Sequence, residues 1–266
     1  MRSFVMVDVS NVEIDAYAYL RTELTVQYLN GRYGDCLARC NAVLGHESEV
    51  LDDNRQRFIW GLMAWCLYWR GEWEEATTMA RQAAQDSETP HIEALNCELM
   101  IAAGTGDPDR THELADELGW SVHTHTARII LATETGNADA YTSSGMQMEF
   151  TGLATNGDGS TPQELGSLCY SVARFYHQRG DSSDAHIALG WANISLGYHE
   201  DSEFHSRATV YMLLVSLYGE MELPGHQYDT LVRAANAWQL SLRQDPTNER
   251  FREQRDKSCE MLDSMH

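Results

Sequence analysis

Residues 54–90 read NRQRFIWGLMAWCLYWRGEWEEATTMARQAAQDSETP, and this stretch decides the fold. Its first half carries small and apolar side chains at the i, i+3, i+4, i+7 spacing of one helical face: Trp60, Met63, Ala64 and Leu67. Gly71 ends that half, because glycine readily adopts the left-handed backbone that closes a helix. Three alanines then recur at helical spacing at positions 76, 80 and 83, and Pro90 closes the unit. The stretch therefore predicts two antiparallel helices joined by a tight turn.

The same layout recurs along the chain. An earlier copy contains Leu20, Leu24, Gly31, Tyr33, Cys36, Cys40 and Val43. A later copy contains Val172, Ala173, Tyr176, Gly180, Ala185, Leu189 and Ala192. Residues 234–246 match the close of a further copy, whose first helix spans about 203–218 and is joined to it by a longer linker at 219–227. Residues 94–118 and 123–150 keep only the turn glycines, so they are either degenerate copies or generic helical hairpins.

This layout resembles the tetratricopeptide repeat (TPR), whose motif reads W-x2-L-G-x2-Y…G-x-Y…A-x3-F-x2-A…P. The resemblance covers most of residues 13–246 and implies an all-α fold, an α-solenoid of about five to six TPR-like helical hairpins. One hairpin cannot bury its apolar face alone, so neighbouring copies must stack. Residues 247–266 predict a C-terminal cap helix with Thr247 or Asn248 as its N-cap.

One stretch has the composition of a loop. Residues 151–162 read TGLATNGDGSTP, which is rich in glycine, asparagine, aspartate and proline. We expect a loop or hinge here, between the N-terminal TPR-like hairpins of residues 1–150 and the C-terminal hairpins and cap helix of residues 163–266.

The net charge argues against a nucleic-acid partner, and the length of the apolar runs argues against a membrane span. The chain has 40 acidic and 19 basic residues and a formal net charge of -21, which repels the phosphates of nucleic acids. The longest apolar run, residues 58–69, is shorter than the roughly 20 residues that a membrane span needs. The first residues do not form a secretory signal. We therefore expect a cytoplasmic protein with reduced cysteines, no membrane span and no nucleic-acid partner.

No metal, cofactor or catalytic residue is predicted. Cys36 and Cys40 share a helix face, but zinc needs four ligands and the repeat explains both as packing residues. His112, His123 and His125 form the densest histidine cluster, yet the last two diverge on a helix. A lysine-containing phosphate loop is impossible, because Lys257 is the only lysine.

The resemblance also implies a binding surface. In the TPR family, the first helices of successive repeats line a concave groove that binds a peptide or protein segment. Carried over position by position, the groove residues are Arg21, Thr25, Phe58, Gly61, Trp65, Tyr68, Trp69, Tyr170, Arg174 and His177. Tryptophan, tyrosine and arginine are enriched at binding hot spots. The alternative is that these aromatic residues belong to the core, or that the chain's own terminus covers them.

The favoured function is a non-catalytic scaffold that binds a protein or peptide, as an adaptor, chaperone or regulatory receptor. Its acidic surface favours a basic or amphipathic partner. The groove contains no lysine, which argues against the carboxylate-clamp mode of the family. The alternative function is an enzyme built on a helical-repeat scaffold, with a histidine and acid site near His112, His123 and His125.

Overall fold

The computed structural model describes residues 16–47, 51–85, 91–137, 161–180 and 182–265, and within these ranges it contains helices and no strand. The helices of the N-terminal half are α1 (Ala16–Leu29), α2 (Tyr33–Glu47), α3 (Asp53–Arg70), α4 (Trp73–Ala84), α5 (Ile92–Gly104), α6 (Pro108–Leu118) and α7 (Val122–Glu134). Those of the C-terminal half are α9 (Pro162–Arg179), α10 (Ser182–Tyr198), α11 (Phe204–Glu220), α12 (Pro224–Gln244) and α13 (Glu249–Ser264).

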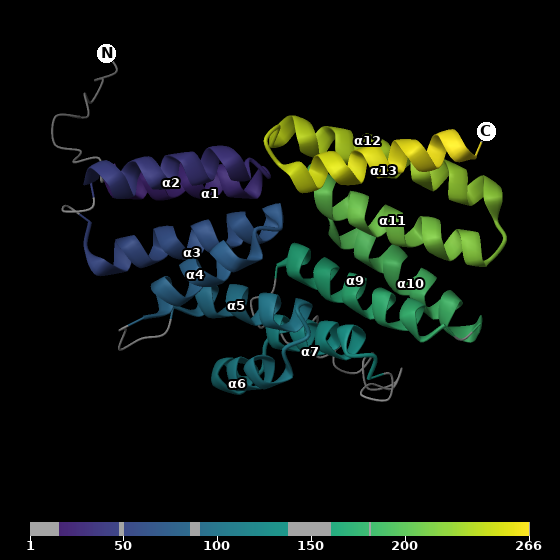
Figure 1. The fold of residues 1–266 in the computed structure, drawn as a ribbon, viewed down its shortest axis with the longest axis horizontal. Coiled ribbons are helices and arrows are strands. Elements are labelled where there is room, and N and C mark those ends of the chain that lie inside the picture. Colours follow the sequence, from purple (N-terminus) through teal and green to yellow (C-terminus); the bar gives the residue numbers. More distant parts are fainter. Residues whose placement is uncertain (1–15, 48–50, 86–90, 138–160, 181, 266) are drawn as a thin grey trace, which may run out of the picture.

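The helices form a curved stack of hairpins (Figure 1). Consecutive helices pair as α1/α2, α3/α4, α5/α6, α9/α10 and α11/α12. The first three pairs pack against one another in order, and so do the last two. Helix α7 packs between α5 and α9, and α13 packs on α12 as a cap. The all-α fold, a solenoid of helical hairpins with a C-terminal cap helix, is therefore confirmed.

Glycines close the predicted turns. Gly31, Gly71, Gly106, Gly136 and Gly180 all have positive φ, between 67° and 82°. At the α3–α4 turn, the Gly71 amide donates to the Tyr68 carbonyl and the Glu72 amide donates to the Leu67 carbonyl. These bonds satisfy carbonyl groups that the end of a helix leaves free. Gly106 shows that α5 and α6 form a true hairpin despite their weak sequence match.

Two connections between helices differ from the prediction. The predicted long linker at 219–227 is wrong, because α11 continues to Glu220 and α12 already begins at Pro224. Proline suits the start of a helix, where its missing N–H group is not needed. The predicted loop at 151–162 ends earlier than expected, since Thr161 caps α9 and Pro162 begins it. The rest of that loop, residues 151–160, lies outside the described residues.

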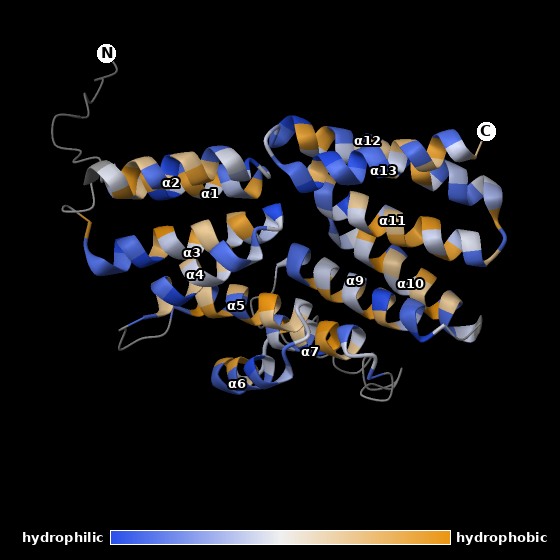
Figure 2. Ribbon diagram, in the orientation of Figure 1, coloured by the Kyte–Doolittle hydropathy of each residue, from blue (hydrophilic) through white to orange (hydrophobic). Residues whose placement is uncertain are grey.

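The core runs between the hairpins. Figure 2 shows hydrophobic and hydrophilic residues alternating along most helices, as expected when each helix buries one face. Small residues allow close approach: Ala76, Ala80 and Ala83 on α4 are 0% exposed, where α4 packs between α3 and α5. Cys36, Cys40 and Cys66 are buried in the core of α2 and α3, and all six cysteines of the chain are free thiols.

The end of the stack returns to its beginning. In Figure 1 the start of α13 lies beside the ends of α1 and α3 and the start of α2. The buried Asp245 carboxylate, at the end of α12, pairs with Arg70 at the end of α3, 3.1 Å away. This contact joins the end of α12 to the end of α3.

Candidate partner-binding site

Four side chains of α3 and α9 form what we call the inner face: Trp65, Tyr68, Tyr170 and Arg174. The rings of Trp65 and Tyr68 meet edge to face, with centroids 5.4 Å apart. Trp65 Nε1 donates to the backbone carbonyl of Glu93 at 3.0 Å, which fixes the indole against α5. The Trp65 ring also lies 6.1 Å from the His123 ring on α7. Contacts from α7 and from the start of α5 therefore hold this tryptophan of α3.

The two tyrosines of the inner face lie in a partly enclosed environment. Both keep some accessible surface, yet burial raises the pKa of Tyr68 to about 12 and also raises the pKa of Tyr170. The positive charges of Arg174 and Arg250 oppose this shift at both hydroxyl groups. Both tyrosines are therefore neutral at physiological pH, and each hydroxyl can donate and accept hydrogen bonds.

The inner face ends in two ion pairs between helices. Arg174 Nη2 lies 2.5 Å from Glu134 Oε1 at the end of α7, and both side chains remain about one-third exposed (33% and 28%). His177 Nε2 lies 2.8 Å from Glu220 Oε1 at the end of α11. Arg174 and His177 thus join α9 to α7 and to α11, and the Arg174 side chain is still one-third exposed.

The predicted groove residue Trp69 adjoins the inner face, since its ring lies 5.1 Å from the Tyr68 ring. It also belongs to a second cluster, which we call the seam: Tyr28, Tyr33, Trp69, His205 and Phe251. Trp69 Nε1 donates to the Tyr28 hydroxyl at 3.1 Å, and its ring lies 5.0 Å from the His205 ring of α11. The Tyr33 hydroxyl and His205 Nε2 are 3.2 Å apart. The His205 and Phe251 rings stack with centroids 5.8 Å apart. The chain's own C-terminal helices therefore cover Trp69.

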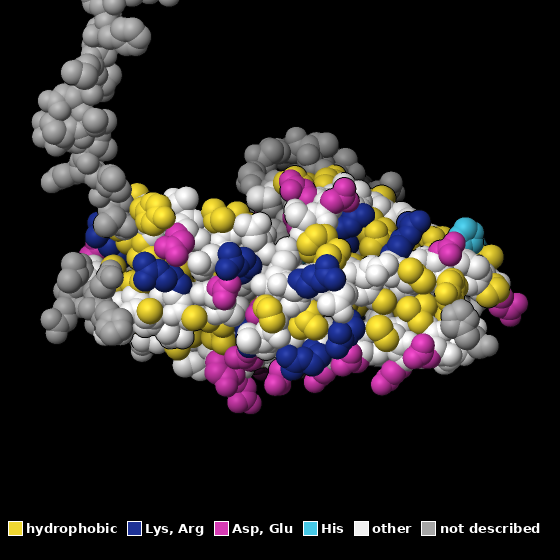
Figure 3. Space-filling view, turned by 90° about the horizontal axis from the view of Figure 1, so that it is seen from above, with side chains coloured by type: hydrophobic (Ala, Val, Ile, Leu, Met, Phe, Trp, Pro, Cys, Tyr) yellow, Lys and Arg dark blue, Asp and Glu magenta, His cyan; other side chains and the backbone are white. Residues whose placement is uncertain are grey.

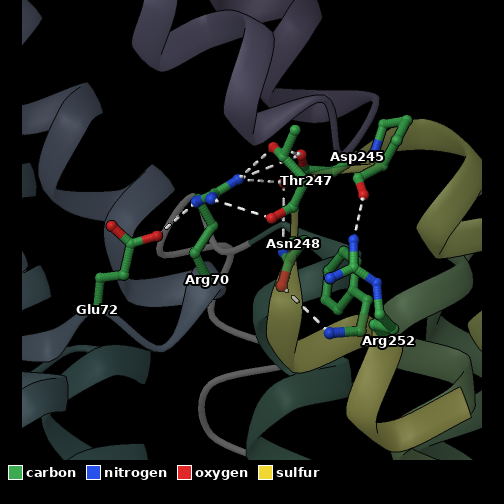
Figure 4. Close-up of polar contacts among 8 residues, drawn as sticks. Arg70, Glu72, Asp245, Thr247, Asn248 and Arg252 are labelled. Atoms are coloured by element: carbon green, nitrogen blue, oxygen red, sulfur yellow. Dashed lines mark hydrogen bonds and ion pairs between the residues drawn. The ribbon is translucent and has the colours of Figure 1, made fainter. Parts of the chain in front are cut away.

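A polar network extends the seam (Figure 4). Arg70 Nη1 donates to Asp245 and to the Thr247 hydroxyl, both at 3.1 Å, while its Nε donates to Glu72 at 2.6 Å. Asn248 caps α13 as predicted, since its side chain accepts a bond from the Phe251 amide at 3.2 Å. The buried charge of Asp245 is thus paired and hydrogen-bonded, as a buried carboxylate requires.

The remaining predicted residues lie elsewhere. The Arg21 guanidinium lies over the Phe58 ring at 5.0 Å, two helical turns or about 10 Å from Trp65 along α3. Thr25 is partly buried on α1. Gly61 is buried, and a Cβ atom there would lie 2.8 Å from the His91 ring. The rings of Trp65 and Tyr68 are thus in contact, and Arg174 acts electrostatically on both Tyr68 and Tyr170. Arg21, Thr25, Phe58 and Gly61 have other neighbours.

The histidines of the alternative, enzymatic site have unlike surroundings. His112 is exposed on α6, and His123 Nε2 lies 3.7 Å from Glu164. His125 is buried, with its ring 5.4 Å from the Trp120 ring. Among the described residues, no three histidine, cysteine or acidic side chains are placed to hold a metal ion.

Sequence reasoning missed Glu134, His205, Arg250 and Phe251. Glu134 and His205 come from copies that match the repeat weakly, and the other two come from the cap helix. Phe251 alone gave a usable sequence signal, because an aromatic residue in an otherwise polar helix indicates that this helix packs against the rest of the chain there. Arg250 forms no ion pair with any residue that the structure describes. Figure 3 shows basic side chains, paired and unpaired alike in colour, spread over the face that carries the N- and C-terminal hairpins.

Comparison with known proteins supports the fold. No protein-family model and no curated protein matches the sequence. A solved structure that the chain resembles is a tetratricopeptide repeat protein from Parabacteroides merdae, with 18% sequence identity and a TM-score of 0.56. The match covers 94% of this chain and 87% of that one. In the described part of the chain, no helix is both long and apolar enough to cross a membrane.

Proposed function

We propose that this chain, which has the helical-repeat fold of tetratricopeptide repeat proteins, is a non-catalytic scaffold that binds a peptide or protein segment on its inner face. The observation that carries the proposal is the grouping of Trp65, Tyr68, Tyr170 and Arg174, which protein surrounds but solvent still reaches. Three rings offer apolar contact area. The arginine and the two hydroxyl groups offer hydrogen bonds to peptide carbonyl groups.

The partner that fits is an amphipathic segment. An aliphatic or aromatic side chain packs against Trp65 and Tyr68, while Arg174 binds backbone or carboxylate oxygens. Basic flanks of the segment gain from the net charge of -21, which speeds encounter with cations over a long range. The role is that of an adaptor, chaperone or regulatory receptor. We place it in the cytoplasm, where free thiols stay reduced.

No described contact favours the enzymatic alternative. Its three histidines lie in three environments: exposed, next to an acidic residue, and buried under a tryptophan. A general acid–base pair must reach the same substrate atoms within hydrogen-bond distance. The scaffold is therefore the function that the geometry supports best.

The test uses a random peptide library displayed on phage, selected on the purified protein. A selected peptide is then titrated against Trp65→Ala and against Trp120→Ala, a control that removes a 54% exposed indole at the α6–α7 turn. We expect Trp65→Ala to weaken binding at least tenfold, because truncating a hot-spot side chain costs about 2 kcal/mol or more. Circular dichroism should show unchanged helicity. Equal affinities of the two variants would contradict the proposal.

A further inference from the structure

An open groove lies between α2 and α4, on the side of the first hairpins away from the inner face, and α3 forms its floor. Its volume is about 540 Å³, within the usual range of about 300–1,000 Å³ for binding sites. Met63 and Leu67 of α3 line the floor, and Leu37 of α2 and Met79 of α4 line the walls. The groove exists because α2 and α4 each pack on α3 but make little contact with each other.

The floor of the groove is apolar and adaptable. Met63 and Leu67 are 7% and 8% exposed, so each presents a small part of its side chain. Leu37 and Met79 are only partly buried, and both pack against the core cluster of α3, α4 and α5. Methionine has an unbranched, polarizable side chain that fits partners of varied shape. A short segment with aliphatic side chains would bury this surface.

The rim of the groove is acidic. Glu72, Glu74 and Glu75 line one end, at the start of α4. Arg70 binds Glu72, but no basic residue that the structure describes pairs with Glu74 or Glu75. Acidic residues also stabilise the first turn of a helix, which explains their presence at this helix end. Stabilisation of the helix end does not explain why an apolar groove floor lies open to solvent beside these acidic residues.

We infer that this groove docks an amphipathic segment of a partner protein, with leucine- or methionine-sized anchors flanked by lysine or arginine. Charge complementarity with Glu74 and Glu75 selects the basic flanks, and the methionine and leucine floor selects the anchors. The site is separate from the inner face, because it is lined by α2 and α4 rather than by α9. It does not depend on the function proposed above.

The probe is a fluorescently labelled 14-residue peptide of leucine and lysine in a helical amphipathic pattern, with a leucine–glutamate peptide of the same pattern as its counterpart. We expect the lysine peptide to bind and the glutamate peptide not to bind, as measured by fluorescence anisotropy at 0.15 M salt. Two variants should weaken binding at least tenfold: Glu74→Lys/Glu75→Lys, which reverses the rim charge, and Thr78→Arg, which fills the groove.

Matched controls separate the groove from general charge attraction. Glu253→Lys/Glu260→Lys changes the net charge equally on α13, and Asn236→Arg adds an equally large side chain on α12. Both should bind the lysine peptide as the wild type does. Equal losses in the controls, or full affinity in the groove variants with helicity intact, would overturn the inference.

Two other occupants of the groove, the first residues of the chain and a second copy of the chain, can be tested separately. Deleting residues 1–15 would raise peptide affinity at least tenfold if that segment filled the groove. A dimer in analytical ultracentrifugation that Thr78→Arg dissociates would show that a second copy fills it. Either result would overturn the assignment to a partner protein, whereas unchanged affinity and a monomer support it.

Discussion

At the residue scale, His205 shows how one side chain joins distant parts of the chain. Its imidazole contacts Tyr33 and Trp69 from the first two hairpins and Phe251 from the cap helix. Burial, together with the positive charge of Arg250, lowers the pKa of His205 to about 3. The imidazole is therefore neutral in the folded state, and its Nε2 atom can accept a hydrogen bond from the Tyr33 hydroxyl group.

This burial predicts a pH dependence of stability. An unfolded histidine has a pKa near 6.5, so below that pH the unfolded state binds a proton that folded His205 does not. The stabilisation is complete above about pH 6.5 and is lost as the pH falls, at a rate approaching ~1.4 kcal/mol per pH unit. We expect the free energy of unfolding of His205→Phe, measured in urea, to fall less steeply between pH 6.5 and 5.

The exposed His112 supplies the control for this prediction. His112→Gln should keep the wild-type slope, because this substitution on the exposed side of α6 leaves the buried imidazole of His205 unchanged. A wild-type slope in His205→Phe would mean that His205 is protonated in the folded protein, and that the seam is less closed than described.

At the element scale, α2 carries two glycines with opposite surroundings. A Cβ atom on Gly34 would lie 2.7 Å from Asp245 Oδ1 and 2.9 Å from the Thr247 hydroxyl oxygen. A Cβ atom on Gly45 would meet nothing within 4 Å. The start of α2 thus packs directly on the polar network of Arg70 and Asp245, while its end is open.

These glycines form a matched pair for mutation. Alanine favours a helix interior over glycine by about 1 kcal/mol, so Gly45→Ala should raise the free energy of unfolding by up to that amount. Gly34→Ala should instead lower it by about 1–3 kcal/mol, because the new methyl group displaces Asp245 from Arg70. Chemical denaturation measures both. Stabilisation by both substitutions would show that α2 does not contact the α12–α13 turn.

Also at this scale, the sequence predicts the individual hairpins, but it does not predict the contact between the first hairpins and the C-terminal helices. Gly71 and the alanines of α4 specify a hairpin through neighbouring residues, and the structure has that hairpin. The Arg70–Asp245 pair joins residues 175 positions apart, which no repeat motif encodes. For the same reason, Trp65 and Trp69 look equivalent in the sequence. Only the packing of α11 and α13 places Trp69 in the seam and leaves Trp65 on the inner face.

At the scale of the whole molecule, the net negative charge opposes the compact folded state. The net charge is -21, and several ion pairs, such as Arg32–Asp35 and Arg55–Asp52, join residues only three positions apart. Such exposed local pairs stabilise the fold by at most about 1 kcal/mol each. Folding holds this net negative charge in a small volume, so long-range repulsion should weaken the folded state at low salt.

Stability should therefore rise with ionic strength. The Debye length falls from about 30 Å at 0.01 M to about 10 Å at 0.1 M, which screens repulsion across the molecule. We expect the thermal midpoint to increase over this range, equally in sodium chloride and choline chloride, since screening does not depend on the cation. A flat response would show that local pairs already compensate the acids. A response to sodium alone would indicate specific ion binding.

The central claim, that the inner face binds the partner, is tested most directly through the Arg174–Glu134 pair. The double variant Arg174→Glu/Glu134→Arg exchanges the two charges, so it keeps the ion pair between α9 and α7 but moves the guanidinium away from Tyr170. A peptide selected on the wild-type protein is titrated against this variant by calorimetry. The account predicts a thermal midpoint close to that of the wild type and an affinity at least tenfold weaker. Wild-type affinity in the exchanged variant would contradict it.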